Sequence, residues 1–170
     1  MKILLFGKTG QVGWELQRSL APLGELISLH TQSDTLCGDL KQLTGIKQTI
    51  LDIAPDVIVN AAAYTAVDKA EQEQESAHTI NAEAPGIMAQ AAMQLNSWLI
   101  HFSTDYVFDG SGCLPRAETD ATNPINTYGK TKLAGEEAIT ESGCKHLIFR
   151  TSWVSGAHGN NFIKTMLRLA

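Results

Sequence analysis

Two side chains spaced four residues apart, Tyr128 and Lys132, could together move a proton. The segment 128–132 opens a predicted helix after the breaker pair Asn123-Pro124, so both side chains project from one face. A phenol titrates near ~10 and a lysine near ~10.4. An ammonium beside the phenol stabilises the phenolate, so we expect a lowered pKa for Tyr128, closer to the pH at which it would transfer protons. The alternative is a tyrosine and a lysine on a solvated helix face, because this spacing is common by chance.

A third polar side chain, Thr104, ends the strand predicted just before this helix. Its hydroxyl could hydrogen-bond a substrate carbonyl and stabilise the oxyanion that develops there. A Thr/Tyr/Lys set arises by chance much less often than the Tyr-Lys pair alone. We therefore assign Thr104, Tyr128 and Lys132 as candidate catalytic residues.

A glycine-rich turn joins the first predicted strand to the first predicted helix, with the sequence Gly7-Lys8-Thr9-Gly10-Gln11-Val12-Gly13. Glycine is needed where a dinucleotide pyrophosphate approaches the backbone and the free N–H groups of a helix N-terminus. We expect Gly7 to allow the tight turn, Gly10 the close approach and Gly13 the packing of helix on strand. The spacing lacks the Lys-Ser/Thr ending of an ATP-binding P-loop, which favours a nicotinamide dinucleotide. A glycine turn without a ligand is the alternative.

The end of the second predicted strand bears on the choice of dinucleotide. An NAD site usually carries an acidic residue about 20 residues after the glycine turn, for the ribose 2′-hydroxyl. His30 stands there, followed by Thr31 and Gln32, so no carboxylate would repel a 2′-phosphate and Lys8 could help to neutralise it. We predict NADPH as the cofactor, with NADH possible. His30 as a surface imidazole without a role is the alternative, and the pair Asp39-Leu40 could bracket the adenine.

These residues need a scaffold of strands that alternate with helices. Short apolar runs predict strands, and continuous runs of this length suit parallel strands covered on both faces. Regular apolar spacing and good helix formers predict helices between them. We expect a doubly wound, Rossmann-like, mostly parallel α/β sheet with helices on both faces, forming one domain over residues 1–170. The predicted strands are 2–6, 26–30, 57–60, 98–103 and 146–150, and the predicted helices include 43–53, 82–95 and 161–170.

Composition excludes several classes of protein. The chain has 170 residues, 44% of them hydrophobic and 18% charged, which suits a single globular domain. A net charge of −5 argues against a general nucleic-acid binder. The longest apolar run near the start, residues 3–6, is too short for a membrane span or a signal peptide, so no membrane partner is expected. Cys37, Cys113 and Cys144 contain no CxxC pair, which indicates free thiols in a reducing cytoplasm.

The segments Phe6–Gly13, Asn60–Glu71, Ser103–Gly110 and Asn126–Lys132 carry a resemblance to a known family. They resemble dTDP-4-dehydrorhamnose reductases, a family of extended-type short-chain dehydrogenases/reductases. The resemblance covers all 170 residues, and the second and third segments are specific to that subfamily. It implies reduction of the C4 ketone of dTDP-4-dehydro-L-rhamnose to dTDP-L-rhamnose, a precursor of lipopolysaccharide O-antigen.

The same resemblance implies roles for individual residues. Asp105 and Trp153, with Thr104, would contact the sugar, Trp153 through its indole ring. For Trp153 the alternative is a core tryptophan at the end of the last strand. Cofactor contacts are implied at Gly10, Gln11, Val12, His30, Asp39, Leu40, Ala62, Ala63, Tyr64, Thr65 and Phe102, beside Tyr128 and Lys132.

The chain also departs from the family pattern. The position of His30 is commonly acidic in the family, and Ser155 stands where tyrosine is usual. The final predicted helix stops without a stop signal, and the family's C-terminal sugar-binding domain has no counterpart, so we expect that the natural polypeptide continues or that this chain is a remnant. No metal site is expected, since Glu118 and Asp120 are interpreted as loop residues. A homodimer, a non-catalytic binding or regulatory module and an inactive remnant all stay open.

Overall fold

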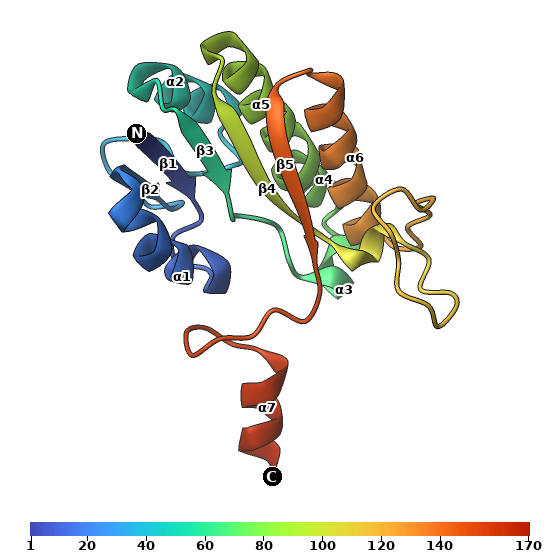
Figure 1. Cartoon of the computed structure of the whole chain (residues 1–170). Helices are drawn as coiled ribbons and strands as arrows, with labels where there is room; N and C mark the ends of the chain where they lie inside the picture. The colour runs from blue at the N-terminus through green and yellow to red at the C-terminus, as the bar shows by residue number, and fades with distance from the viewer.

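Five parallel strands form one sheet in the order β2-β1-β3-β4-β5 (Figure 1). The computed structural model describes all 170 residues. All five predicted strands are present, with ends that differ from prediction by one residue at most. The bounds are β1 (Lys2–Phe6), β2 (Glu25–Leu29), β3 (Val57–Asn60), β4 (Trp98–Thr104) and β5 (Lys145–Thr151).

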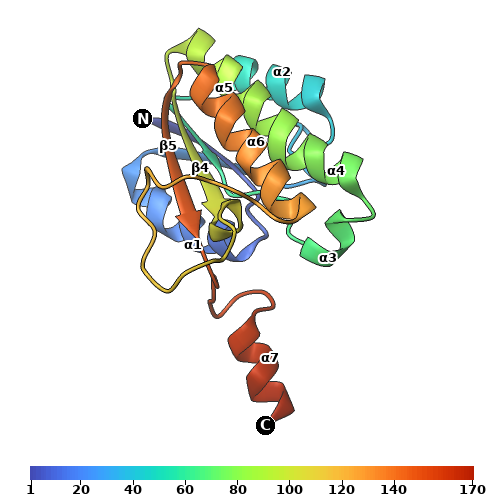
Figure 2. The same ribbon diagram turned by 90° about the vertical axis from the view of Figure 1, so that its right-hand side faces the viewer.

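Helices cover the two faces of this sheet unequally. Helix α1 packs on one face, against Ile3 and Leu5, while α2, α5 and α6 pack on the other, against Leu4, Ile58 and Leu99 (Figures 1 and 2). The predicted fold class is confirmed. The helices are α1 (Gln11–Leu20), α2 (Leu43–Ile53), α3 (Val67–Ala70), α4 (Gln74–His78), α5 (Ala84–Leu95), α6 (Thr127–Glu141) and α7 (Phe162–Leu169), with short helical turns η1 (Ala21–Leu23), η2 (Thr79–Glu83) and η3 (Asp105–Val107).

The predicted helix 82–95 begins differently from expectation. Regular α-helix starts at Ala84, which places Pro85 in the first turn, where a missing N–H costs no hydrogen bond. The π-helical turn η2 comes directly before it and buries Asn81. That side chain donates to the hydroxyl of Thr131 on α6 (3.2 Å) and accepts from the backbone N–H of Tyr64 (2.9 Å). The turn therefore attaches the segment after β3 to helix α6.

The last helix lies apart from the sheet. Helix α7 projects away from the body of the molecule, and the C-terminus lies at its tip (Figures 1 and 2). None of its residues is buried. The segment before it returns to the glycine turn, because the His158 ring stacks on Trp14 at 4.2 Å and its Nε2 lies 3.0 Å from the carbonyl of Thr9. No helix of the chain combines the length and the apolar character that crossing a membrane would require.

Candidate functional site

The principal cleft opens at the carboxyl ends of the parallel strands. It encloses about 680 Å³, within the range of small-molecule and cofactor sites. From β1 the sheet extends to β2 on one side and to β3, β4 and β5 on the other, so the strand order switches direction between β1 and β3. Open α/β sheets bind ligands in the crevice at the carboxyl ends of the strands beside such a switch point. The glycine turn after β1 lines one part of the cleft and the residues around Thr104 after β4 line another.

The glycine turn has the geometry of a close backbone approach. Gly7 adopts φ +87°, and its N–H donates to the carbonyl of Leu29 at the end of β2 (3.0 Å). Gly10 precedes α1, whose first turn receives no side-chain cap. Uncapped N–H groups at a helix N-terminus are suited to an anion. Gly13 lies behind the turn, outside the cleft, and is buried against the carbonyl of Gly7, so its part is packing.

The structure brings most of the predicted cofactor residues together. His30 lines the cleft, and its Nδ1 accepts from the backbone N–H of Gln32 (3.2 Å), which leaves Nε2 to carry the ring proton. Tyr64 does not line the cleft, because its hydroxyl donates to Glu73 (2.7 Å) on the outer side. The predicted residues on the cleft wall are Gly7, Gly10, Gln11, Val12, His30, Asp39, Leu40, Ala62, Ala63, Thr65, Phe102, Thr104, Asp105, Tyr128, Lys132 and Trp153.

Thr104, Tyr128 and Lys132 all reach the same end of the cleft. Thr104 ends β4, and Tyr128 and Lys132 lie one turn apart at the start of α6. Asn126 caps that helix by accepting from the backbone N–H of Gly129 (2.8 Å). The helix start can approach η3, the turn after β4, because Gly129 has no side chain: a Cβ there would meet the carbonyl of Tyr106.

The expected effect of Lys132 on Tyr128 is wrong for this structure. The pKa of Tyr128 is raised, first by burial, and the charge of Asp105 adds to this while a hydrogen bond with Thr104 opposes it. The amine of Lys132 is directed elsewhere, since it donates to the carbonyl of Phe102 (2.7 Å) and lies 3.0 Å from Nε2 of His101. The phenol therefore remains protonated to a higher pH than an exposed tyrosine.

Lys132 itself titrates unusually. Burial lowers its pKa from 10.5 to about 8, and the charge of Glu136 one turn later acts in the opposite direction. Between about pH 8 and 10.5 the unfolded chain binds more protons at this group than the folded chain, so its unfavourable contribution to stability is relieved as the pH rises. Below pH 8 the full cost is present.

We expect a pH-dependent difference between the wild type and Lys132→Met. From pH 7 to 9.5, the free energy of unfolding of the wild type should rise by about 2 kcal/mol relative to the variant. Urea unfolding at both pH values measures this. A difference that stays constant with pH would show that Lys132 has an ordinary pKa.

Asp105 and Trp153 both line the cleft. Asp105 accepts from the hydroxyls of Ser152 (2.6 Å) and Thr104 (3.2 Å), which joins the ends of β4 and β5. Trp153 is 76% exposed and meets the Phe162 ring at 5.0 Å, so it is not a core tryptophan. Its backbone has φ +50°, a conformation that few non-glycine residues adopt.

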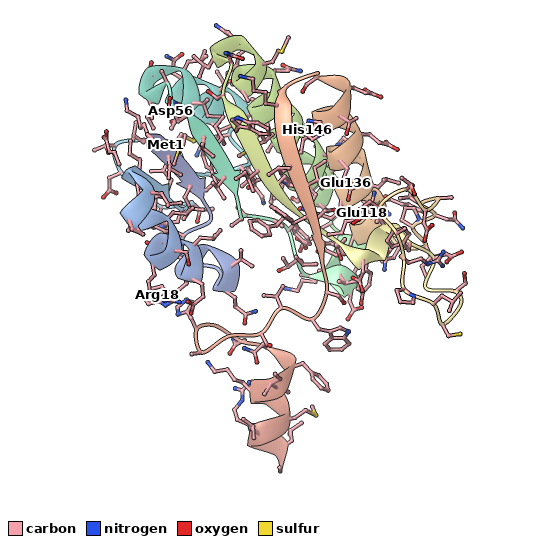
Figure 3. The ribbon with its side chains drawn as sticks, viewed as in Figure 1. Met1, Arg18, Asp56, Glu118, Glu136 and His146 are labelled. Carbon is pink, nitrogen blue, oxygen red and sulfur yellow. The ribbon has the colours of Figure 1, made fainter.

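Glu136, Arg150 and Ser103 form a polar cluster beneath the cleft that the sequence analysis missed. Arg150 on β5 donates to both carboxylate oxygens of Glu136 on α6, and Ser103 on β4 donates to the same carboxylate. Figure 3 shows Glu136 near Glu118 of the 109–126 loop, whose carbonyl accepts from Arg150. The arginine therefore joins this loop to the sheet.

Other wall residues could have been found from position alone. Thr151 and Ser152 end and follow β5, and the carboxyl ends of parallel strands share one edge of the sheet. Glu118 and Asp120 lie in the loop as predicted, and Asp120 accepts from the backbone N–H of Ala117 (2.9 Å). The remaining wall residues that were missed are Thr9, Thr31, Gly38, Ala61, Val67, Ile80, Ser103, Tyr106 and Val154.

A Rossmann-like sheet with a glycine turn and a Thr/Tyr/Lys set on one cleft defines a domain of the short-chain dehydrogenase/reductase type. Residues 1–170 match the RmlD substrate binding domain, and the chain belongs to that family.

Relatives and solved structures agree with this membership. The chain is 62% identical over 170 residues to the dTDP-4-dehydrorhamnose reductase of Escherichia coli strain K12 and 61% identical to that of Salmonella typhimurium strain LT2. All of this chain is aligned in both cases, and it spans 57% of the length of each relative.

Two crystal structures superpose closely. The dTDP-4-dehydrorhamnose reductase of Clostridium acetobutylicum gives a TM-score of 0.92 at 41% identity, over 99% of this chain and 59% of that one. The Bacillus anthracis dTDP-4-dehydrorhamnose reductase in complex with NADP gives 0.91 at 38% identity, over 99% and 60%.

Proposed function

We propose that this chain is the dinucleotide-binding part of a reductase that converts dTDP-4-dehydro-L-rhamnose to dTDP-L-rhamnose. The observation that carries the proposal is one cleft that connects an uncapped helix N-terminus to Thr104, Tyr128 and Lys132. The names of the relatives support the choice of substrate.

The residues present fit a nicotinamide dinucleotide. The N–H groups at the start of α1 face the cleft without a side-chain cap, and an alanine Cβ at Gly10 would approach nothing closer than 3.5 Å. A pyrophosphate would rest there, next to the positive end of the helix dipole. A bound reduced nicotinamide supplies a hydride.

Thr104 and Tyr128 would act on the substrate carbonyl. The Thr104 hydroxyl would donate to the carbonyl oxygen and orient it. As the carbonyl carbon gains the hydride, the phenol O–H of Tyr128 breaks and its proton passes to the new alkoxide, leaving a phenolate that regains a proton from water. The raised pKa of Tyr128 suits this direction, because the proton donor is present in its protonated form.

NADPH is the preferred cofactor in this proposal, with NADH possible. His30 lines the cleft, and residues 30–32 contain no carboxylate that would repel a 2′-phosphate. The NADP complex of the Bacillus anthracis relative supports the same preference.

The cellular setting is a further part of the proposal. The three cysteines are free thiols, which suits a reducing cytoplasm, and dTDP-L-rhamnose would be consumed in O-antigen synthesis.

Fluorescence titration of the chain with NADPH, NADH and dTDP tests the proposal. We expect NADPH to bind and Gly10→Ala to weaken its binding by about tenfold or more, or about 1.4 kcal/mol, since the added methyl separates the pyrophosphate from the backbone. Gly156→Ala is the matched control, because a Cβ there meets nothing within 4 Å. If NADPH fails to bind the wild type, the proposed function is wrong.

A further inference from the structure

Three buried polar side chains from three elements form a hydrogen-bonded series beneath the cleft. Asn60 on β3 lies opposite His101 on β4 in the sheet register, and the side chain of Lys132 reaches His101 from α6. Each is at most 1% exposed. Nδ2 of Asn60 lies 3.1 Å from Nδ1 of His101, and Nε2 of His101 lies 3.0 Å from Nζ of Lys132.

The backbone sets the orientation of the Asn60 amide. The N–H of Ala62 can only donate, and it lies 3.1 Å from Oδ1 of Asn60. Turning the amide over would place its NH₂ group against this N–H, donor against donor. The oxygen of Asn60 therefore faces Ala62, and its NH₂ group faces His101.

The orientation of the amide then sets the tautomer of His101. An NH₂ group can only donate, so Nδ1 of His101 must accept and carries no proton. A neutral imidazole with a bare Nδ1 holds its proton on Nε2, which faces Lys132. An ammonium has no lone pair to receive that N–H. A neutral amine has one, and it can also donate to the carbonyl of Phe102 at 2.7 Å.

We propose that Asn60 and His101 are positioning residues that hold an N–H donor against Lys132 and so favour its neutral amine over its ammonium.

The charges around Asn60, His101 and Lys132 are consistent with a donor that favours the neutral amine. Burial, followed by the charge of Lys132, holds the pKa of His101 well below its usual range, so the ring is neutral. Glu136 on α6 is the acidic group that favours the ammonium, but Arg150 on β5 pairs with its carboxylate at 2.6 Å. The other titratable groups at this end of the cleft are Tyr128 on α6 and Asp105 and Tyr106 on η3. Burial, opposed by the charge of Glu136, lowers the pKa of Lys132 to about 8, and the donor from His101 acts in the same direction as burial.

This role rests on the proposed function. The smaller the share of ammonium at Lys132, the less its charge stabilises a phenolate at Tyr128, which favours the protonated phenol that reduction of a ketone requires. Asn60, His101 and Lys132 would thus help Tyr128 to act as a proton donor.

NMR of the protein, labelled with ¹⁵N and ¹³C, measures the tautomer of His101 and the pKa of Lys132 directly. We expect His101 to show a protonated Nε2 and a bare Nδ1, with its signals assigned by their loss in His101→Phe. A protonated Nδ1 would overturn the proposal. Neither result depends on NADPH binding, so failure of this inference is distinct from failure of the proposed function.

The variant Asn60→Asp reverses the donor pattern. A carboxylate can accept from both Ala62 and His101, so the ring proton should move to Nδ1 and leave Nε2 to accept from the ammonium of Lys132. We expect the pKa of Lys132, followed at its Cε, to rise by about one unit or more, a tenfold gain in proton affinity. Asn123→Asp adds the same charge on an exposed loop and should leave both signals unchanged. An increase in the lysine pKa without the tautomer change would show an effect of charge alone and would refute the tautomer mechanism.

Discussion

Replacing Gly13 by alanine should destabilise the fold by about 3 kcal/mol or more. An alanine Cβ at this position would lie 2.0 Å from the carbonyl oxygen of Gly7 and 2.7 Å from its carbonyl carbon. The Gly7 turn cannot yield, because its N–H is bonded to Leu29 and a backbone segment at Ala62 packs against its other side. Helix α1 would have to separate from the end of β1. The melting temperature should fall by about 6–12 °C.

Gly10→Ala is the matched control for this prediction. It belongs to the same turn, but its Cβ would make an ordinary contact at 3.5 Å and its backbone is in an extended conformation open to alanine. We expect it to unfold within about 1 kcal/mol of the wild type while binding NADPH more weakly. Equal stability of the two variants in urea would show that close packing at Gly13 does not hold α1 on the sheet.

The second large effect is expected at Arg150. Its loss would leave the carboxylate of Glu136, whose side chain is 7% exposed, without its paired cation. Breaking a buried pair on one side costs about 3 kcal/mol or more. The guanidinium also lies 5.1 Å from the centre of the Phe108 ring, so Arg150→Met should loosen the attachment of the 109–126 loop.

Two comparisons isolate the buried charge as the cause. Arg150→Met combined with Glu136→Gln should recover at least about half of the lost stability, because the buried carboxylate is then neutral. Arg116→Met removes an arginine that also stacks on Phe108 and pairs with Asp109, but that pair is 35% and 34% exposed. We expect it to cost less than about 1 kcal/mol. Equal losses in urea unfolding for Arg116→Met and Arg150→Met would contradict this explanation.

Much of the scaffold could be predicted because its signals are local. Continuous apolar runs such as 2–6 and 57–60 are typical of strands buried on both faces, and they appear where expected. The glycine turn and the Tyr128–Lys132 spacing place chemistry at the ends of predicted elements, and the carboxyl ends of parallel strands share one edge. The convergence of Gly10, Thr104 and Tyr128 on one cleft follows from this topology.

The protonation states at the site needed the tertiary structure. Spacing alone predicts that Lys132 lies beside the phenol of Tyr128 and lowers its pKa. The fold instead buries both groups and turns the amine toward His101 and Phe102. Nothing near Lys132 in the chain signals those partners, because His101 lies 31 residues away.

The amino-acid sequence by itself determined the strands, most helices and the end of the sheet where a ligand would bind, since periodicity and glycine spacing act over a few residues. Only the tertiary structure decided which buried groups meet: the sheet register sets Asn60 opposite His101, and the packing of α6 brings Glu136 to Arg150 and Lys132 to His101. Desolvation and hydrogen-bond polarity depend on such long-range contacts, and they set the pKa of each group in the site.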